Sequence, residues 1–186
     1  MRRVNRSRQF EATALPHLPA LYRFARQLTD DETAPDLVQE AFVRAWKYFH
    51  SFKADTNCRA WLFRIVHNVW RDAMRSRRLE IPLNETEQTS IEPYYDWEEE
   101  FLRNQFSPVT GEALAQVPEV YRVAMLLADV EEFSYQEIAE IMGCPVGTVM
   151  SRVNRGRRTL ARLLRDSHDA TETAVQLTER DSSEVH

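Results

Sequence analysis

Residues 134–165 have the sequence SYQEIAEIMGCPVGTVMSRVNRGRRTLARLLR, and the arrangement of the C-terminal half of the chain follows from this segment. Ser134 stands before a short apolar run and Glu137 follows three residues later, which is the capping box that begins a helix. Gly143 and Pro145 mark the end of that helix and the start of the next. A short helix, a tight turn containing glycine and a longer arginine-rich helix predict a helix-turn-helix.

The longer helix has an apolar side and a polar side when its residues are placed at 100° intervals. Its packed side is expected to contain Val149, Val153, Gly156, Leu160 and Leu163. A glycine on that side indicates a close approach by another helix, because glycine otherwise costs about 1 kcal/mol against alanine in a helix interior. The polar side and its flanks carry Ser151, Arg152, Asn154, Arg155, Arg157, Arg158 and Arg162. Side chains of these types contact base edges and phosphates in a major groove, which favours DNA binding over a solvated helix of an ordinary bundle.

Three further helices are expected in the N-terminal half, over residues 9–28, 35–49 and 59–78, because apolar residues recur there every three or four positions. The third helix has an apolar back and a narrow basic ridge, which suits a phosphate backbone. The ridge consists of Arg64, Asn68, Arg71, Arg75 and Arg78.

Short polar side chains precede this third helix and are suited to binding an extruded base. The loop that supplies them contains Lys53, Asp55, Thr56 and Asn57. Aromatic residues on the helix itself either pack in the core, which is the more frequent case, or stack on bases. They are Trp61, Phe63 and Trp70.

The second helix has an outer face of mixed charge, which excludes a DNA-binding surface. Its members are Asp36, Gln39, Glu40, Val43, Arg44 and Lys47. A face of this kind that includes a valine indicates either a protein-binding surface or a solvated side of the helix.

Charge divides the 186-residue chain into segments that its net charge of −5 conceals. Residues 41–79 have a balance of +7, and residues 80–106 have a balance of −7. No alternating apolar and polar run of useful length occurs, so an all-α fold of two small helical domains is expected. We expect a first domain at 1–79, a flexible acidic linker at 80–107, a second domain at 108–165 and an acidic, disordered tail at 166–186.

Several function classes have little support in the sequence. The two cysteines are far apart, the five histidines are scattered, and no phosphate-binding loop or Ser/His/Asp pattern occurs. We therefore expect no metal, no cofactor and no catalytic activity. No apolar run approaches the ~20 residues that span a bilayer, and no secretory signal begins the chain, so a cytoplasmic location is expected.

Three segments resemble the signature stretches of bacterial extracytoplasmic-function sigma factors, in that family's order. They are residues 36–46 (DLVQEAFVRAW), 57–65 (NCRAWLFRI) and 145–157 (PVGTVMSRVNRGR). The resemblance implies that the two domains are a sigma region 2 helical bundle and a sigma region 4 helix-turn-helix. Residues 55–57 and 128–131 also resemble the subgroup that responds to thiol-oxidative stress through an anti-sigma factor.

The resemblance also implies roles for individual residues. The clamp of the largest subunit of core RNA polymerase would be bound by Asp36, Gln39, Glu40, Val43, Arg44 and Lys47. The minus-ten promoter element would be melted and read by Lys53, Asp55, Thr56, Asn57, Arg64, Asn68, Arg71 and Arg75. The minus-thirty-five element would be read by Thr148, Ser151, Arg152, Asn154, Arg155, Arg157 and Arg158.

The expected function is that of a sigma factor, which binds core RNA polymerase and promoter DNA and directs promoter-specific initiation. Control of a stress regulon through an anti-sigma factor is expected with it. The alternative is a free-standing helix-turn-helix regulator whose first domain serves dimerisation or ligand sensing. Two basic faces on one chain favour the sigma factor, because they suit two promoter elements.

Overall fold

The computed structural model describes residues 2–29, 31–53, 56–79 and 108–183, and every regular element in these ranges is helical. The expected all-α class is confirmed. The acidic linker expected at 80–107 lies outside the described residues, as does Asp55.

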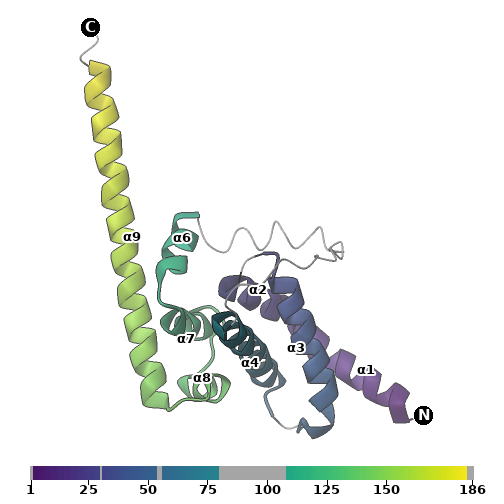
Figure 1. Ribbon diagram of the computed structural model, residues 1–186. Coiled ribbons are helices and arrows are strands. Elements are labelled where there is room, and N and C mark those ends of the chain that lie inside the picture. The colour runs from purple at the N-terminus through teal and green to yellow at the C-terminus, as the bar shows by residue number, and fades with distance from the viewer. Residues whose placement is uncertain (1, 30, 54–55, 80–107, 184–186) are drawn as a thin grey trace.

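The N-terminal unit consists of the helices that precede residue 80 (Figure 1). They are α1 (Arg2–Ala14), the 3-10 turn η1 (Leu15–His17), α2 (Leu18–Leu28), α3 (Ala34–Tyr48), the 3-10 turn η2 (Phe49–Ser51) and α4 (Cys58–Leu79). The single helix expected over 9–28 is thus divided at residues 15–17. Pro16 and Pro19 account for the division, because proline lacks the N–H that an α-helix interior requires.

An aromatic cluster joins α1 to α3 in this unit. The ring of Phe10 lies 5.1 Å from that of Phe49 and 5.3 Å from that of Trp46, in edge-to-face geometry. Helix α4 begins at a side-chain cap, since the Asn57 side-chain oxygen accepts a hydrogen bond from the Ala60 amide at 3.2 Å.

The C-terminal unit consists of α6 (Pro108–Gln116), α7 (Glu119–Asp129), α8 (Tyr135–Met142) and α9 (Val146–Ser183). The capping box is present: the Glu137 amide donates to the Ser134 hydroxyl, and the Ser134 amide donates to the Glu137 carboxylate at 2.9 Å. Gly143 ends α8 in the left-handed conformation at φ +62°. The helix-turn-helix therefore forms where the sequence indicates it.

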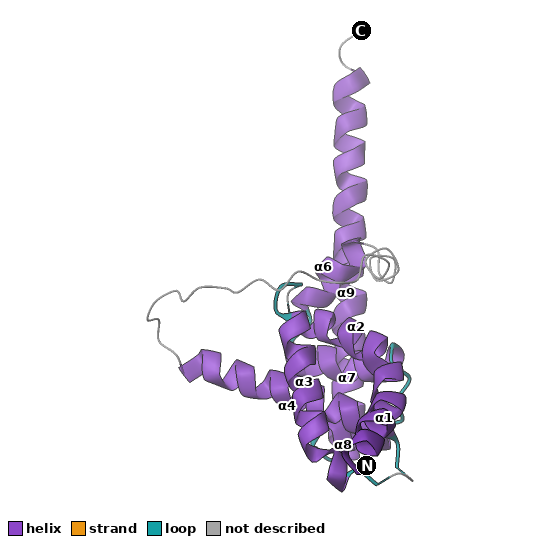
Figure 2. Cartoon of the chain, turned by 90° about the vertical axis from the view of Figure 1, so that its right-hand side faces the viewer, coloured by secondary structure: helices purple, strands orange, loops and turns teal. Residues whose placement is uncertain are grey.

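Helix α9 extends well past the rest of the molecule, as both Figure 1 and Figure 2 show. It includes residues 166–183, for which we expected a disordered tail. The chain has no glycine or proline after Gly156, so nothing in its backbone chemistry stops the helix once it has begun.

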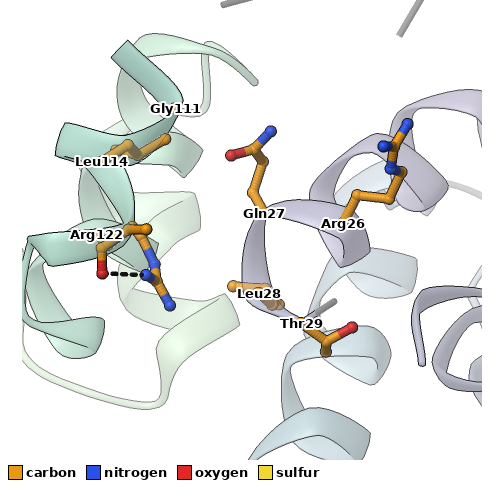
Figure 3. A pocket seen from close by; sticks show the side chains of 8 residues that line it. Arg26, Gln27, Leu28, Thr29, Gly111, Leu114 and Arg122 are labelled. Carbon is orange, nitrogen blue, oxygen red and sulfur yellow. Dashed lines mark hydrogen bonds between the residues drawn. The ribbon is translucent and has the colours of Figure 1, made fainter. Parts of the chain in front are cut away.

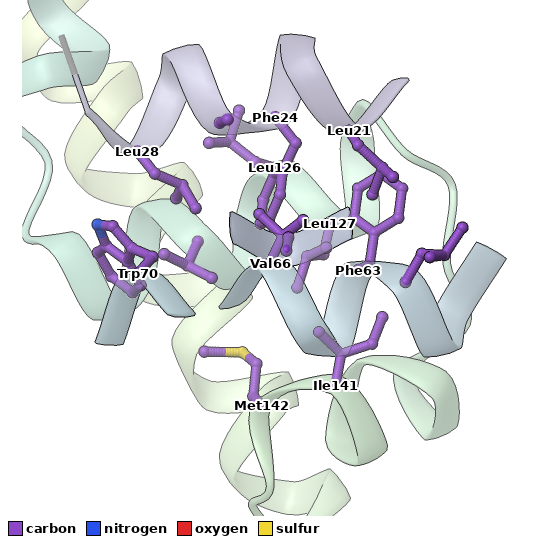
Figure 4. Close-up of a cluster of buried hydrophobic side chains, with 14 of the residues drawn as sticks. Leu21, Phe24, Leu28, Phe63, Val66, Trp70, Leu126, Leu127, Ile141 and Met142 are labelled. Atoms are coloured by element: carbon purple, nitrogen blue, oxygen red, sulfur yellow. The ribbon is translucent and has the colours of Figure 1, made fainter. Parts of the chain in front are cut away.

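The two units pack directly on each other and share one hydrophobic core (Figure 4). Helix α4 packs against α8, and α2 packs against α7. Phe63 and Trp70 of α4 are both buried, at 0% and 4% exposure, so these two rings are core residues and do not present a surface for bases. Trp61 is partly buried against Phe52, with ring centroids 5.0 Å apart. We call the contact between the units the inter-unit interface.

Helix α9 approaches α7 closely at Gly156, which confirms the inference from the place of this glycine on the packed side. A Cβ atom there would lie 3.0 Å from the Tyr121 carbonyl oxygen and 3.3 Å from the Met125 Cβ. The carbonyl belongs to a helix backbone and cannot move aside at low cost. A substitution must therefore separate two helices or distort one of them.

Gly156→Ala is expected to lower the free energy of unfolding by about 1–3 kcal/mol, although alanine favours helix over glycine. Gly111→Ala is the matched control, because a Cβ on Gly111 of α6 meets nothing within 4 Å. That control is expected to leave stability unchanged or to raise it. Urea unfolding of both variants checks the pair, and a stabilising effect of Gly156→Ala would contradict the assigned contact.

His67 is a buried imidazole of α4 with charged groups near it from both units. Burial is the largest cause that lowers its pKa to about 4, and the charges of Arg71 and Arg152 lower it further. A hydrogen bond with the Ile141 backbone on α8 acts in the opposite direction. The Nδ1 atom has no hydrogen-bond partner within the described structure.

The folded protein is expected to lose stability as the pH falls from about 6.5 to about 4, because His67 then binds a proton in the unfolded chain only. The stability that the neutral His67 contributes is fully present above about pH 6.5 and amounts to roughly 3–4 kcal/mol at most. His67→Gln should remove this part of the pH dependence of the unfolding free energy, whereas the part that is due to the carboxylates of the chain should remain. Unfolding free energies measured across this pH range check the difference, and parallel profiles would refute it.

Candidate nucleic-acid and protein interfaces

The first half of α9 presents its polar side to solvent as the angular pattern predicts. Val149, Val153 and Gly156 are buried, whereas Asn154 and Arg158 are exposed. Neither of these exposed side chains has a hydrogen-bond or ion-pair partner among the described residues. These two side chains, and Arg162, which is also exposed and has no partner among the described residues, are therefore available to an external ligand.

Other members of the face are fixed by contacts within the C-terminal unit. Arg155 donates to the Tyr121 hydroxyl at 3.2 Å, and its guanidinium lies 5.9 Å from the centre of that ring. Arg157 forms a two-pronged ion pair with Asp129 of α7, with an Nε–Oδ2 distance of 3.0 Å, and this pairing raises the pKa of Arg157. These two arginines remain partly at the surface, but α7 determines where they point.

The N-terminal end of the same face is close to the turn of the helix-turn-helix. Arg152 is half-buried and donates to the Cys144 Sγ at 3.5 Å. The Ser151 hydroxyl donates to the Thr148 carbonyl at 2.9 Å, and Thr148 is itself half-buried. Ser151 is exposed and keeps its acceptor capacity for an external donor.

The basic ridge of α4 is exposed along the described part of the helix. Arg64, Arg71 and Arg75 are exposed and Asn68 is half-buried, while the side chain of Arg78 lies outside the described set. The structure thus brings the ridge residues into one row on the outside of the N-terminal unit. The ridge lies near the polar face of α9, since Arg71 and Arg152 both act on the buried ring of His67.

The loop before α4 divides between solvent and the inter-unit interface. Lys53 is exposed, and its carbonyl accepts hydrogen bonds from the Thr56 amide at 3.0 Å and the Thr56 hydroxyl at 2.8 Å. Asn57 caps α4 with its oxygen, and its amide nitrogen donates to the Glu137 carboxylate at 2.7 Å. That carboxylate has a pKa below its ordinary value, mainly because of its hydrogen bonds with Ser134. One predicted base-reading residue is therefore held by the other unit.

The outer face of α3 combines exposed polar groups with an apolar patch. Arg44 donates to Glu40 at 2.7 Å and to Asp72 of α4 at 3.0 Å, and both hydrogen bonds raise the pKa of Arg44. Val43 is 56% exposed, and Trp46 beside it is 40% exposed. The remaining predicted members of this face are exposed: Asp36, Gln39, Glu40 and Lys47.

A small cleft of about 240 Å³ lies between α2 and the start of the C-terminal unit (Figure 3). Arg122 and Leu114 line one side, and Gln27 and Leu28 line the other. Arg122 donates to the Ala115 carbonyl at 3.1 Å, and burial lowers the pKa of Arg122.

The described residues contain no cluster of side chains that could hold a metal ion, and no described helix is long and apolar enough to cross a membrane.

Sequence reasoning missed the charged residues of the inter-unit interface. Glu131 follows α7, its side chain is 1% exposed, and it pairs with Arg23 and Arg59 of the N-terminal unit. No periodic signal marks these three residues, because Glu131 lies between helices and the arginines resemble other surface cations. Trp46 is a further exposed apolar residue of α3 that the predicted polymerase-binding set does not include.

Two family models match the chain in order along the sequence. Residues 14–80 match sigma-70 region 2, and residues 110–160 match sigma-70 region 4. The chain is 36% identical over 151 residues to the ECF RNA polymerase sigma factor EcfG of Rhodopseudomonas palustris, covering 81% of this chain and 82% of that protein. It is 31% identical over 135 residues to the ECF RNA polymerase sigma-E factor of Escherichia coli strain K12, covering 68% of this chain and 71% of that protein.

Solved structures give a matching fold. The sigma factor RpoE of Bartonella quintana, in complex with the anti-sigma factor NepR, is 33% identical with a TM-score of 0.67, covering 84% of this chain and 97% of that one. CnrH, in complex with the cytosolic domain of CnrY, is 27% identical with a TM-score of 0.61, covering 86% of this chain and 90% of that one.

Arg158→Ala is expected to weaken binding to a mixed-sequence DNA duplex and to reduce the salt slope of log K by about 0.9, the value for one lost phosphate contact. Arg157→Ala is the matched control, because its guanidinium is already paired with Asp129 and should change the slope less. Asn154→Ala removes no charge and should leave the slope unchanged. Binding measured over a range of salt concentrations checks this order, and equal slopes for both arginine variants would contradict it.

Proposed function

The chain belongs to the extracytoplasmic-function sigma-70 family, and we propose on this premise that it is a sigma factor that binds core RNA polymerase and directs promoter-specific transcription initiation. The observation that carries the proposal is the presence of two separate basic faces in two units that match region 2 and region 4. A free-standing regulator would have no use for the exposed ridge of α4. The proposed role is that of an initiation factor without chemistry of its own, acting in the cytoplasm with polymerase and chromosome.

We propose that the residues at positions matching the motifs of the sigma family have the roles that the family resemblance implies. We assign the minus-thirty-five element to the exposed side of α9, with Asn154 and Ser151 for base edges and Arg158 for phosphate. Arg152, Arg155 and Arg157 would support that face, because each is already positioned by a neighbour. The minus-ten element would be bound by the ridge of α4 and the loop at 53–57.

Binding both elements at once requires the units to separate. Elements about 25 base pairs apart lie on the order of 80 Å apart along B-form DNA. In the structure, by contrast, Arg71 of one face and Arg152 of the other both act on the same imidazole. Charges interact appreciably only over about 10 Å at ordinary salt. We therefore propose that core polymerase holds the two units apart in the active complex.

Control by an anti-sigma factor is part of the proposal. Its support is that the related structures of the Bartonella sigma factor and of CnrH were both solved with a partner protein bound, named as an anti-sigma factor in the first case. The stress regulon and the narrower resemblance to the thiol-oxidative-stress subgroup stay predictions.

Val43→Glu is expected to weaken binding to core RNA polymerase by roughly tenfold, because it places a charge in the exposed apolar patch of α3. Val109→Glu is the matched control: it makes the same change on α6 at a valine that is 52% exposed, against 56% for Val43. Co-purification with core polymerase and transcription with the purified components measure the effect. Equal behaviour of the two variants would exclude α3 as the docking helix, and no stimulation of transcription by the unaltered protein would exclude the proposed function.

A further inference from the structure

The inter-unit interface contains one fully buried carboxylate, that of Glu131 at 1% side-chain exposure. Arg23 of α2 donates to it through Nε at 3.2 Å and through Nη2 at 3.4 Å. Arg59 of α4 donates to the same carboxylate and, through Nη1, to the Glu131 backbone carbonyl at 2.7 Å. We call this group of three residues the inter-unit ion pair.

All the side-chain partners of this carboxylate within the described structure belong to the other unit. Inside its own unit, Glu131 uses only its backbone amide, which donates to the Leu126 carbonyl at 3.0 Å. Separation of the units therefore removes every bond of the carboxylate, and nothing in the fold of the C-terminal unit requires a charge there. A buried charge without a structural use in its own unit indicates a role in the contact itself.

The backbone beside Glu131 supports the same conclusion. Glu132 has φ +53°, and it is the one non-glycine residue with a positive φ in the described ranges. This conformation is unfavourable for a residue with a Cβ. It turns the chain so that Glu131 and Phe133, on either side, both reach the N-terminal unit. Phe133 packs edge-to-face on Phe63 of α4 with ring centroids 4.9 Å apart.

Arg59 connects the polar and the apolar parts of the contact. Its guanidinium lies 4.3 Å from the centre of the Phe133 ring and 5.1 Å from the centre of the Phe63 ring, while it also holds Glu131. Cation–π contact and charge-assisted hydrogen bonding thus act on one side chain. Asn57, two residues earlier, adds the hydrogen bond to Glu137 across the same interface.

We propose that the inter-unit ion pair controls the equilibrium between a closed chain, with the units packed together, and an open chain that can engage core polymerase. A carboxylate and two guanidinium groups fix one closed arrangement, because an unpaired charge at this position would be strongly unfavourable. The same groups recover their hydration when the units part, so they oppose opening less than an apolar contact of equal size. The polymerase consequence rests on the proposed function, whereas the closed–open equilibrium does not.

The consequence for assembly is quantitative. If only the open chain binds core polymerase, the apparent dissociation constant equals the intrinsic one divided by the open fraction. Weakening the inter-unit ion pair should therefore tighten apparent binding to polymerase, although no residue of the proposed polymerase surface changes. A residue that merely supported the fold would have the opposite effect.

Glu131→Gln in the full chain tests the proposal, because it removes the charge and nearly preserves the shape. Glu140→Gln is the matched control, since Glu140 is an exposed carboxylate of α8 with no partner among the described residues. X-ray scattering measures the radius of gyration, circular dichroism measures helix content, and a competition assay measures binding to core polymerase. We expect Glu131→Gln to expand the molecule at constant helix content and to tighten apparent polymerase binding by about tenfold. The control should do neither.

Each possible outcome either supports the proposed closed–open equilibrium or contradicts it. Unchanged dimensions of Glu131→Gln would overturn the proposal, and so would expansion accompanied by loss of helix, which indicates a folding role. Should Glu131→Gln fail to fold at all, Arg23→Ala is the second variant. It removes one of the two guanidinium partners of Glu131, leaves Arg59 in place, and is also expected to expand the chain. A folded Arg23→Ala of unchanged dimensions would then overturn it. Expansion without tighter polymerase binding would support the equilibrium and count against the proposed function.

Discussion

Helix α4 must bury apolar side chains toward its own bundle and toward α8 at the same time, and the rest of the structure depends on this double burial. Phe63 contacts Phe24 of α2 on one side and Phe133 of the other unit on the other. Because such a helix cannot be covered by the N-terminal bundle alone, the two units share one core. The basic row lies on the side of α4 that stays exposed, so packing itself determines where the ridge lies.

Electrostatics follows the same division. The acidic residues that the C-terminal unit brings to the interface, Glu131 and Glu137, meet Arg59 and Asn57 at the start of α4. Arg158 and Arg162 of α9, which have no partner among the described residues, are exposed, whereas Arg152 is half-buried beside the turn. Packing of the two units therefore uses a positive group at the start of α4, and it leaves the positive groups along the rest of the helix available to an external ligand. The chain, whose net charge is −5, can therefore carry two basic surfaces, and the repulsion between these surfaces does not prevent the two units from packing together.

Patterns of neighbouring residues in the sequence predicted the helices and their ends well. They could not predict which helices contact each other in the folded chain. The capping box at Ser134, the left-handed Gly143 and the packed Gly156 each depend on a few neighbouring residues, so the sequence was sufficient. The angular pattern could show which side of α9 is polar. It could not show that Arg157 pairs with Asp129, because that requires knowing which helix lies opposite. Glu131 was missed for the same reason: burial of a charge is decided by a partner unit, and periodicity within one segment has no information about it.

The contacts inside the C-terminal unit differ from the interface contacts in one respect that matters for opening. Gly156 against Tyr121, Arg155 against the Tyr121 ring, and Arg157 against Asp129 all join α9 to α7. None of these residues takes part in the inter-unit ion pair. Separation of the units can therefore leave the DNA-facing side of α9 in place, because the side chains that orient it move together with it. A polymerase that parts the units would have to break the contacts of Glu131, Phe133 and Glu137 together with the packing of α8 on α4 and of α7 on α2, but it would receive a preformed reading helix.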